Sequence, residues 1–254
     1  MPSTDSAGQP WAGRSFTPNP AVGDDGSAPE AFLEGMRAFR AGELSASGLV
    51  AAIAECRFLI PLVAVAGEEG ENEHGVRIDK TQELSIITVA GPDGRPILPV
   101  FSSVAAMTNW RPDARPVPAT AQRVALAAAS EQTDRVVIDA RGDEVVLPRP
   151  AVWAIARGTG WVPAIDDPEV VEAITRPAEE HPEIVAVAPV GGDPELRGSG
   201  PEIVVRLAVA PGVGADRLRE VIGAMSARWA SDPIVAERVD ALSVQPVMLP
   251  ADGD

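Results

Sequence analysis

The segment from Leu84 to Pro118 constrains the fold of this chain more than any other part of its sequence. Two runs rich in β-forming residues, 84–90 and 96–101, flank the turn sequence Pro92-Asp-Gly94. In such a turn the proline presets one φ angle and the glycine accepts a positive φ. The pattern therefore predicts a β-hairpin.

A short helix is predicted directly after this hairpin. Ser102 and Ser103 are both good N-cap residues, and the apolar run that starts at Val104 ends in Asn109-Trp110. The proline-rich sequence 111–118 cannot continue a helix. The unit as a whole is strand, turn, strand, capped helix and proline-rich exit.

Short helices and strands of both kinds fill the rest of the chain, which predicts an α+β fold with two small, mixed, sandwich-like domains and largely antiparallel sheets. The predicted helices cover residues 27–41, 45–55, 104–110, 119–131, 150–157, 168–180 and 214–230, and the predicted strands cover residues 58–64, 84–90, 96–101, 135–139, 144–147, 183–190, 202–210 and 242–248. The expected organisation is a disordered tail (1–22), an N-terminal α+β domain (23–163), a C-terminal domain of order α-β-β-α-β (164–250) and a short tail (251–254).

Four residues give specific local expectations. Ser27 has the capping-box spacing to Glu30, so it should cap the first helix. Pro61 cannot donate to a β-ladder, so it should lie at a sheet edge or bulge. Gly158 should end the helix before it, and Cys56, between an apolar helix and a buried strand, should be a buried structural thiol.

Charge and composition exclude several classes of protein. The net charge of -16 argues against a nucleic acid or an anionic membrane as partner. One cysteine cannot form an intramolecular disulfide, and no stretch approaches the roughly 20 apolar residues of a membrane span. With no signal-peptide pattern at the N-terminus, we expect a soluble cytoplasmic protein.

The known chemical motifs fail when they are tested in turn. Gly212-Val-Gly214 follows a strand as a dinucleotide fingerprint would, but Arg217 stands where its third glycine belongs. Lys80, the only lysine, follows aspartate, so no Walker A motif exists. The two histidines, His74 and His181, are far apart. We therefore expect no catalytic, cofactor-binding or metal-ligating residues, and no cofactor.

One surface hypothesis survives these tests. Tryptophan beside arginine is a composition typical of interaction hot spots. The alternative is that Trp110 packs on the core and the arginines are only solvated. The candidate interaction surface consists of Phe101, Ser102, Ser103, Trp110, Arg111 and Arg115.

Several motifs occur in the order expected of one family. The chain resembles the SseB family, in particular its actinobacterial members, over roughly residues 21–163. A serine stands at position 102, where the resemblance leads us to expect threonine. The motifs are Ala21-Val-Gly-Asp-Asp-Gly-Ser27, Phe58-Leu-Ile-Pro-Leu-Val63, Leu98-Pro-Val-Phe-Ser-Ser103, Asn109-Trp110, Ala114-Arg-Pro-Val-Pro118 and Val136-Val-Ile-Asp139.

The resemblance implies a phenotype, enhanced serine sensitivity, and no catalytic residues. Our first hypothesis is a non-enzymatic cytoplasmic module that works through protein contacts. The second is a small-molecule binder or enzyme connected with serine or sulfur metabolism, with a pocket near Ser102, Ser103, Arg77 and Asp79. The third is an acidic immunity-like or chaperone-like protein for a basic partner, because residues 164–254 carry 17 acidic and 7 basic side chains.

Overall fold

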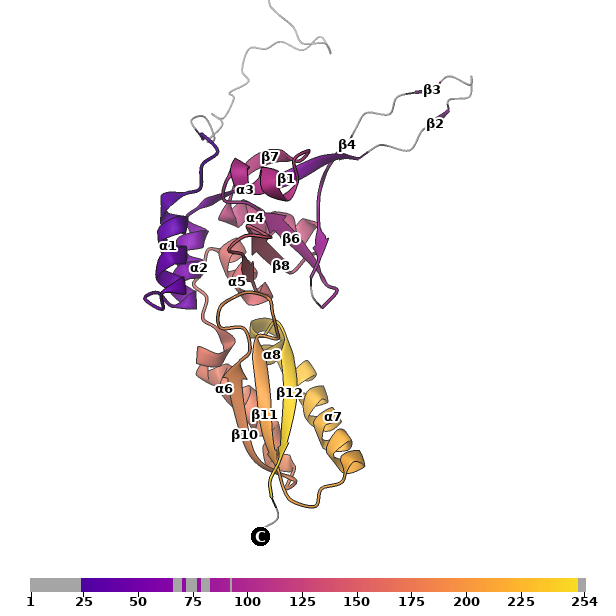
Figure 1. Cartoon of the computed structure of the whole chain (residues 1–254). Coiled ribbons are helices and arrows are strands. Elements are labelled where there is room, and N and C mark those ends of the chain that lie inside the picture. The colour runs from indigo at the N-terminus through magenta and orange to yellow at the C-terminus, as the bar shows by residue number, and fades with distance from the viewer. Residues whose placement is uncertain (1–23, 66–69, 72–76, 79–82, 92, 251–254) are drawn as a thin grey trace, which may run out of the picture.

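The computed structural model describes residues 24–65, 70–71, 77–78, 83–91 and 93–250. In these ranges the chain forms two lobes, an N-terminal lobe up to residue 163 and a C-terminal lobe from residue 164 (Figure 1). Both lobes combine helices with small, mostly antiparallel sheets, which confirms the α+β class. None of the described helices has the length and apolar character needed to cross a bilayer.

Helices and short strands alternate in the N-terminal lobe. Its helices are α1 (Glu30–Arg40), α2 (Ala46–Ala54), α3 (Val104–Trp110), α4 (Ala121–Ser130) and α5 (Arg149–Arg157). Its strands are β1 (Arg57–Val65), β2 (Gly70–Glu71), β3 (Arg77–Ile78), β4 (Glu83–Ile86), β5 (Val89–Ala90), β6 (Pro96–Val100), β7 (Arg115–Thr120), β8 (Arg135–Ile138) and β9 (Val145–Leu147).

Two sheets meet inside this lobe. One has the order β4-β1-β7 and is antiparallel; the other has the order β5-β6-β8-β9, with β6 and β8 parallel. Leu59 and Phe101 exchange backbone hydrogen bonds of 2.8 and 3.0 Å and so join the two sheets. Apolar side chains of both sheets and of α1, α2, α4 and α5 then form one core.

An aromatic pair fixes α1 on this core. Phe32 of α1 and Phe58 of β1 pack edge to face with ring centroids 5.5 Å apart, and both rings are almost fully buried. Such pairs contribute about 0.5–1.5 kcal/mol beyond the burial of their area. Cys56 is buried nearby as a free thiol that donates to the carbonyl of Ala52, which confirms the structural thiol.

The predicted hairpin is present, but its first arm is divided. β5 and β6 pair antiparallel, and Gly94 adopts φ +78° in the turn. The expected single strand 84–90 is instead β4, which pairs with β1, followed by β5, which pairs with β6. The chain therefore changes sheets at residues 87–88, next to the point where the alternation of Leu84-Ser-Ile86 shifts its phase to Ile87-Thr-Val89.

Local chemistry sets several of the helix ends. Ser103 caps α3 by accepting from Ala106 N, Ser45 caps α2, and Gly158 ends α5 with φ +66°. The predicted capping box at Ser27 was wrong. The hydroxyl of Ser27 donates instead to Asp25, and α1 begins at Glu30 after Pro29 without a side-chain cap.

Pro61 does not lie in an edge strand, so that expectation was wrong. β1 has neighbours on both sides, and Pro61 stands opposite Pro116 of β7. On the other side of β1, Leu59 bridges to Phe101 and pairing with β4 starts only at Leu62. Pro61 therefore occupies the gap between two partners, where no donor is required.

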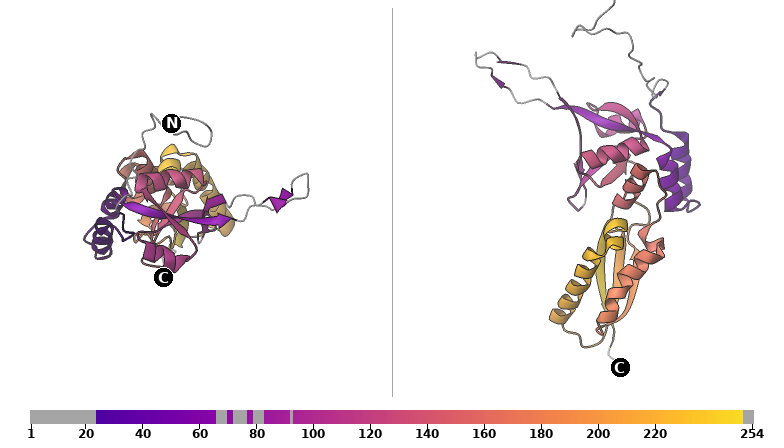
Figure 2. Two further views of the ribbon diagram at one scale, coloured as in Figure 1. Left: turned by 90° about the horizontal axis from the view of Figure 1, so that it is seen from above. Right: turned by 180° about the vertical axis from the view of Figure 1, so that it is seen from behind.

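The C-terminal lobe packs its helices on one face of a three-stranded sheet of order β10-β11-β12. Ile203, Val205, Leu207 and Val209 of the central strand point into the core between sheet and helices. Figure 2 shows α6 and α7 side by side on this covered face. The elements are α6 (Pro168–Thr175), α7 (Ala215–Ser231), α8 (Pro233–Arg238), the 3-10 helices η1 (Ala164–Asp166) and η2 (Arg176–Glu180), and the strands β10 (Ile184–Gly191), β11 (Ile203–Val209) and β12 (Leu242–Met248).

Prolines stand on both outer edges of this sheet. Ile203 N donates to Ala241 O and Leu249 N donates to Val209 O, so the odd-numbered residues of β12 donate to β11 and Pro246 faces the free edge. The bond from Gly192 N to Glu202 O shows that in β10 the even-numbered residues donate to β11, so Pro189 faces the other free edge. Each edge therefore lacks one donor near its middle.

Candidate functional site

Two of the six residues of the predicted interaction surface belong to the buried interior. Phe101 is 0% exposed and Ser102 is 3% exposed, so neither can meet a partner, and that part of the prediction was wrong. The ring of Trp110 packs on Phe101 with centroids 5.1 Å apart, the arrangement expected if Trp110 covers the core. Ser103 is occupied as the cap of α3.

The two arginines of that prediction remain at the surface. The Nε of Arg111 donates to Asp113 over 3.0 Å, and Arg115 is exposed on β7. The pocket expected near Ser102 also involved Arg77 and Asp79. Asp79 lies outside the described residues, and of Arg77 only the backbone is described, so that expectation stays untested.

Ser102 has a structural partner instead. Its backbone N–H and its hydroxyl both donate to the carboxylate of Asp139, over 2.8 and 2.6 Å. Asp139 adopts φ +55° and starts the turn between β8 and β9. The carboxylate therefore ties the end of β6 to that turn, and Ser102, at 3% exposure, presents almost no surface to a substrate.

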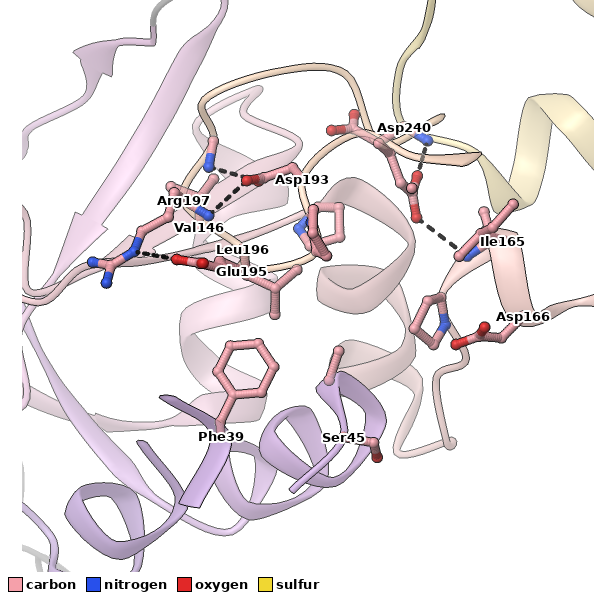
Figure 3. A pocket seen from close by; sticks show the side chains of 18 of the residues that line it. Phe39, Ser45, Val146, Ile165, Asp166, Asp193, Glu195, Leu196, Arg197 and Asp240 are labelled. Carbon is pink, nitrogen blue, oxygen red and sulfur yellow. Dashed lines mark hydrogen bonds and ion pairs between the residues drawn. The ribbon is translucent and has the colours of Figure 1, made fainter. Parts of the chain in front are cut away.

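A cavity of about 820 Å³ lies between the two lobes (Figure 3). The N-terminal lobe contributes residues of α1, α2 and β9, and the C-terminal lobe contributes η1 and the loop 192–202. In Figure 3 Phe39 and Ser45 line one wall, Asp193 to Arg197 a second, and Ile165, Asp166 and Asp240 a third. Segments about 200 residues apart in the chain therefore share one site.

Part of the cavity wall is apolar. Phe39 and Leu44 lie against the N-terminal core, and Leu196 of the loop 192–202 is itself a member of that core, only 6% exposed. The Leu196 carbonyl accepts from Val146 N over 2.7 Å, so the loop is held on β9. Trp161 completes this wall; its indole N–H is buried and has no hydrogen-bond partner among the described residues.

Arg40 at the end of α1 fastens the loop to the N-terminal lobe. Its guanidinium donates to Glu195 O over 2.6 Å, to Glu144 O over 2.8 Å and to the Asp143 carboxylate over 3.1 Å. All three nitrogens are therefore occupied. Hydrogen bonds from a charged donor contribute about 1.5–3 kcal/mol each when they are shielded from water, and less at this part-exposed position.

Asp193 organises the loop from within. Its carboxylate accepts from Arg197 N over 3.0 Å, from Gly198 N over 2.7 Å and from the Ser199 hydroxyl over 3.2 Å (Figure 3). Gly198 has φ +65°, and a Cβ there would lie 2.9 Å from a methyl group of Val146. The loop thus needs glycine at this point to lie flat on β9.

A cluster of four charged side chains joins the lobes beside the cavity. Arg135 of β8 donates to Asp240 over 2.6 Å and to Asp93 over 2.8 Å. Arg95 donates to the same two carboxylates over 3.1 and 2.8 Å. The side chains of Arg135 and Asp240 are 8% and 4% exposed, so their charges depend on each other for stabilisation.

Glu202 differs from the other charged groups of the wall. It accepts from Asp240 N over 2.7 Å and from Ala164 N over 3.4 Å, and among the described residues it forms no ion pair. Burial is the main cause that raises the pKa of the Glu202 carboxyl above its ordinary value. In the described part of the chain, the guanidinium of Arg149 is the one positive charge that lowers this pKa, and it is the smallest of the causes, so the protein compensates the negative charge of Glu202 only weakly.

These groups suit binding better than metal chemistry. In the described ranges no three His, Cys, Asp or Glu side chains are grouped so that they could hold a metal ion. The cavity offers instead an apolar wall, paired arginines and a part-buried carboxylate. Such a combination fixes the orientation of an organic molecule.

Sequence patterns gave only indirect signals for this site. Residues of two stretches between the predicted elements, 158–167 and 191–201, line the cavity. A loop rich in glycine and proline between two strands is a common place for function. The partners of Asp193 lie in the loop itself, but the contacts from Arg40 and Val146 that hold the loop come from the other lobe and could not be assigned.

Comparison with known proteins identifies the N-terminal lobe. The family model of the SseB protein N-terminal domain matches residues 30–154, which span α1 to the middle of α5. No curated protein and no solved structure matches the chain.

Proposed function

The chain belongs to the SseB family, and from the geometry of the cavity between its lobes we propose that it is a small-molecule-binding protein with a regulatory and not a catalytic role. The observation that carries this proposal is the cavity itself. Its volume of about 820 Å³ lies inside the range of roughly 300–1,000 Å³ that ligand pockets occupy. Domain interfaces are also a preferred place for such pockets.

Several polar side chains of the cavity are engaged in hydrogen bonds and ion pairs within the protein, which supports a role without catalysis. Arg40 and Asp193 use their side chains to hold the loop 192–202, and Asp240 is held by two arginines. A catalytic base or nucleophile must be free to exchange a proton or attack. Arg40, Asp193 and Asp240 instead maintain the shape of the cavity.

A regulatory role follows from the placement of the walls. A ligand in the cavity would contact α1 and α2 of one lobe and η1 of the other. It would therefore favour the arrangement in which both lobes contact it, by as much as its affinity differs between arrangements. A partner protein could then detect the ligand through a change in the relative arrangement of the two lobes.

A tryptophan side chain introduced into the cavity should displace a bound ligand, and this tests the proposal. Ala46, at the start of α2, lines the cavity, whereas Ala51 on the same helix is exposed and lies outside it. Native mass spectrometry of protein purified from its own organism should show a retained small molecule. It should be absent from Ala46→Trp and present in Ala51→Trp. Equal retention by both variants, or by neither variant nor the wild type, would refute the proposal.

A second candidate is a protein-interaction module, which the C-terminal sheet favours. Its face opposite α6 and α7 is uncovered, and Val247 of β12 is 48% exposed there (Figures 1 and 2). Co-purification of one stoichiometric protein that is lost with Val247→Asp and kept with Ala46→Trp would support this candidate. Retention of that protein by Val247→Asp would exclude the sheet face as its site.

A further inference from the structure

The charges on the cavity wall differ in how far the protein itself neutralises them. The guanidinium of Arg40 is occupied by two carbonyls and a carboxylate, and that of Arg135 by two carboxylates. Arg197 lies 2.8 Å from Asp143 and 3.6 Å from Glu195. The wall therefore has little positive charge left to attract an anion.

The carboxylates are not balanced in the same way. Asp193 is satisfied by its own loop and Asp240 by Arg95 and Arg135. Glu202 has only two backbone N–H groups, and Asp166 of η1 forms no ion pair among the described residues. The charge that remains uncompensated on the wall is negative, and it lies on the η1 side of the cavity.

Opposite this acidic side lies the apolar wall formed by Phe39, Leu44 and Leu196. Figure 3 shows Phe39 and Leu196 on the side of the cavity away from Ile165 and Asp166. A ligand that spans the cavity would thus meet an apolar surface at one end and a carboxylate at the other. A carboxylate shielded from water gains more from a cation than an exposed carboxylate does.

We infer that the cavity takes an organic cation, a molecule with an apolar body and a positively charged amine that lies against Glu202. This inference rests on the proposed ligand-binding function and specifies its chemistry. The apolar body lies on Phe39 and Leu196, and the ammonium group supplies the counter-charge that Glu202 lacks. The net charge of -16 adds a long-range attraction for cations.

Three probes that share one apolar body test this chemistry: 4-phenylbutylamine, 4-phenylbutanol and 4-phenylbutyrate. Their Kd values for the full chain are measured by isothermal titration calorimetry. We expect the amine to bind at least about tenfold more tightly than the alcohol, and the carboxylate to bind most weakly, because an ion pair at a part-buried site outweighs a neutral contact.

Glu202→Gln keeps an acceptor for Asp240 N and removes the negative charge. It should bring the Kd of the amine to that of the alcohol and leave the alcohol unchanged. Asp216→Asn removes one negative charge at a position 89% exposed on α7, far from the cavity residues, and should change no Kd. Thermal unfolding of each variant checks that the fold is intact.

The outcomes separate the ligand class from the proposed function. Equal affinity for all three probes, tightest binding of the carboxylate, or amine binding that is unaffected by Glu202→Gln would overturn the cationic class. The same holds if no probe binds while the native protein retains a molecule that Ala46→Trp loses; the cavity then binds a ligand of another class. The proposed function is refuted by the retention test, when Ala46→Trp and Ala51→Trp retain a molecule equally or when neither variant nor the wild type retains one.

Discussion

At the residue scale, single arginines hold segments that no strand or helix joins. Arg57 at the start of β1 donates to both oxygens of Asp24, over 2.6 and 2.5 Å, and to the carbonyls of Ser27 and Ser102. These hydrogen bonds from Arg57 are the main reason that the pKa of Asp24 is lowered. The ionised carboxylate therefore stabilises the folded chain, with a strength that depends on pH.

Asp24→Asn tests this dependence. The folded pKa of Asp24 lies below its unfolded value of about 3.9, so the contribution is complete at neutral pH and is lost as the pH falls through the folded pKa. We expect the variant to be about 1–2 kcal/mol less stable at pH 7, with a difference that shrinks toward pH 3. Urea unfolding at several pH values measures it.

Asp134→Asn serves as control, since it removes the same charge from an exposed side chain that forms no ion pair among the described residues. A gap between wild type and Asp24→Asn that stays constant down to pH 3 would mean that Arg57 does not stabilise the charged form of Asp24.

At the element scale, the ends of helices depend on a few backbone positions. Gly158 ends α5 in the left-handed region, with φ +66° and open space where a Cβ would be. Gly160, two residues on, also has open space but no positive φ. The two glycines thus differ in conformation and not in packing.

Alanine at these two positions should therefore act differently. Gly158→Ala must place a Cβ in a left-handed conformation, which costs about 1 kcal/mol. Gly160→Ala should be neutral or stabilise by a few tenths of a kcal/mol, because it reduces the freedom of the unfolded chain. Chemical denaturation of both variants gives the comparison, and an equal effect at the two sites would show that the left-handed conformation does not limit the end of α5.

Elements with local signals were predictable from the sequence. The hydroxyl of Ser103 caps α3, and Gly94 and Gly158 adopt the positive φ angles that their turn and helix end require. Helix α8 was missed although Asp232 caps it and Pro233 is its first residue, because six residues are too few for a periodic pattern. The division between β4 and β5 depends on which strand lies alongside, and the phase shift at Ile86-Ile87 does not by itself predict a change of sheet.

The cavity could not be predicted from the sequence either, because it too depends on contacts between distant segments of the chain. Its walls combine Phe39, Leu196 and Asp240, which become neighbours only when the lobes meet. The sequence did indicate where loops and acidic residues occur. Which arginine neutralises which carboxylate, and hence that Glu202 has none among the described residues, follows only from the tertiary structure.

At the scale of the whole molecule, polar contacts join the two lobes. Arg149 of α5 donates to the carbonyls of Ala236 and Val239 at the end of α8, and Arg40 holds Glu195 O. Leu196 adds an apolar contact from the C-terminal loop to the N-terminal core. The lobes are therefore coupled through a few identifiable side chains.

Arg40→Ala should release the loop 192–202 without unfolding either core. We expect amide hydrogen exchange in that loop to become roughly tenfold faster, while exchange in β11 stays unchanged, because only local opening becomes easier. Mass spectrometry of exchange resolves the two regions. Arg37→Ala, on an exposed position of the same helix, is the matched control.

An unchanged loop in Arg40→Ala would show that Leu196 and Asp193 hold it without help. Faster exchange throughout β11 as well would show that the contact stabilises the whole C-terminal lobe.

The prolines at the edges of the C-terminal sheet have a consequence for aggregation with neighbouring molecules. A short sheet with two free edges could recruit further strands from neighbouring molecules and grow without limit. Pro189 and Pro246 each remove one backbone N–H donor from an edge strand, so a strand added at either edge would lack one hydrogen bond near its middle. The sheet is thereby kept finite, and its face can stay open to other molecules without seeding fibres.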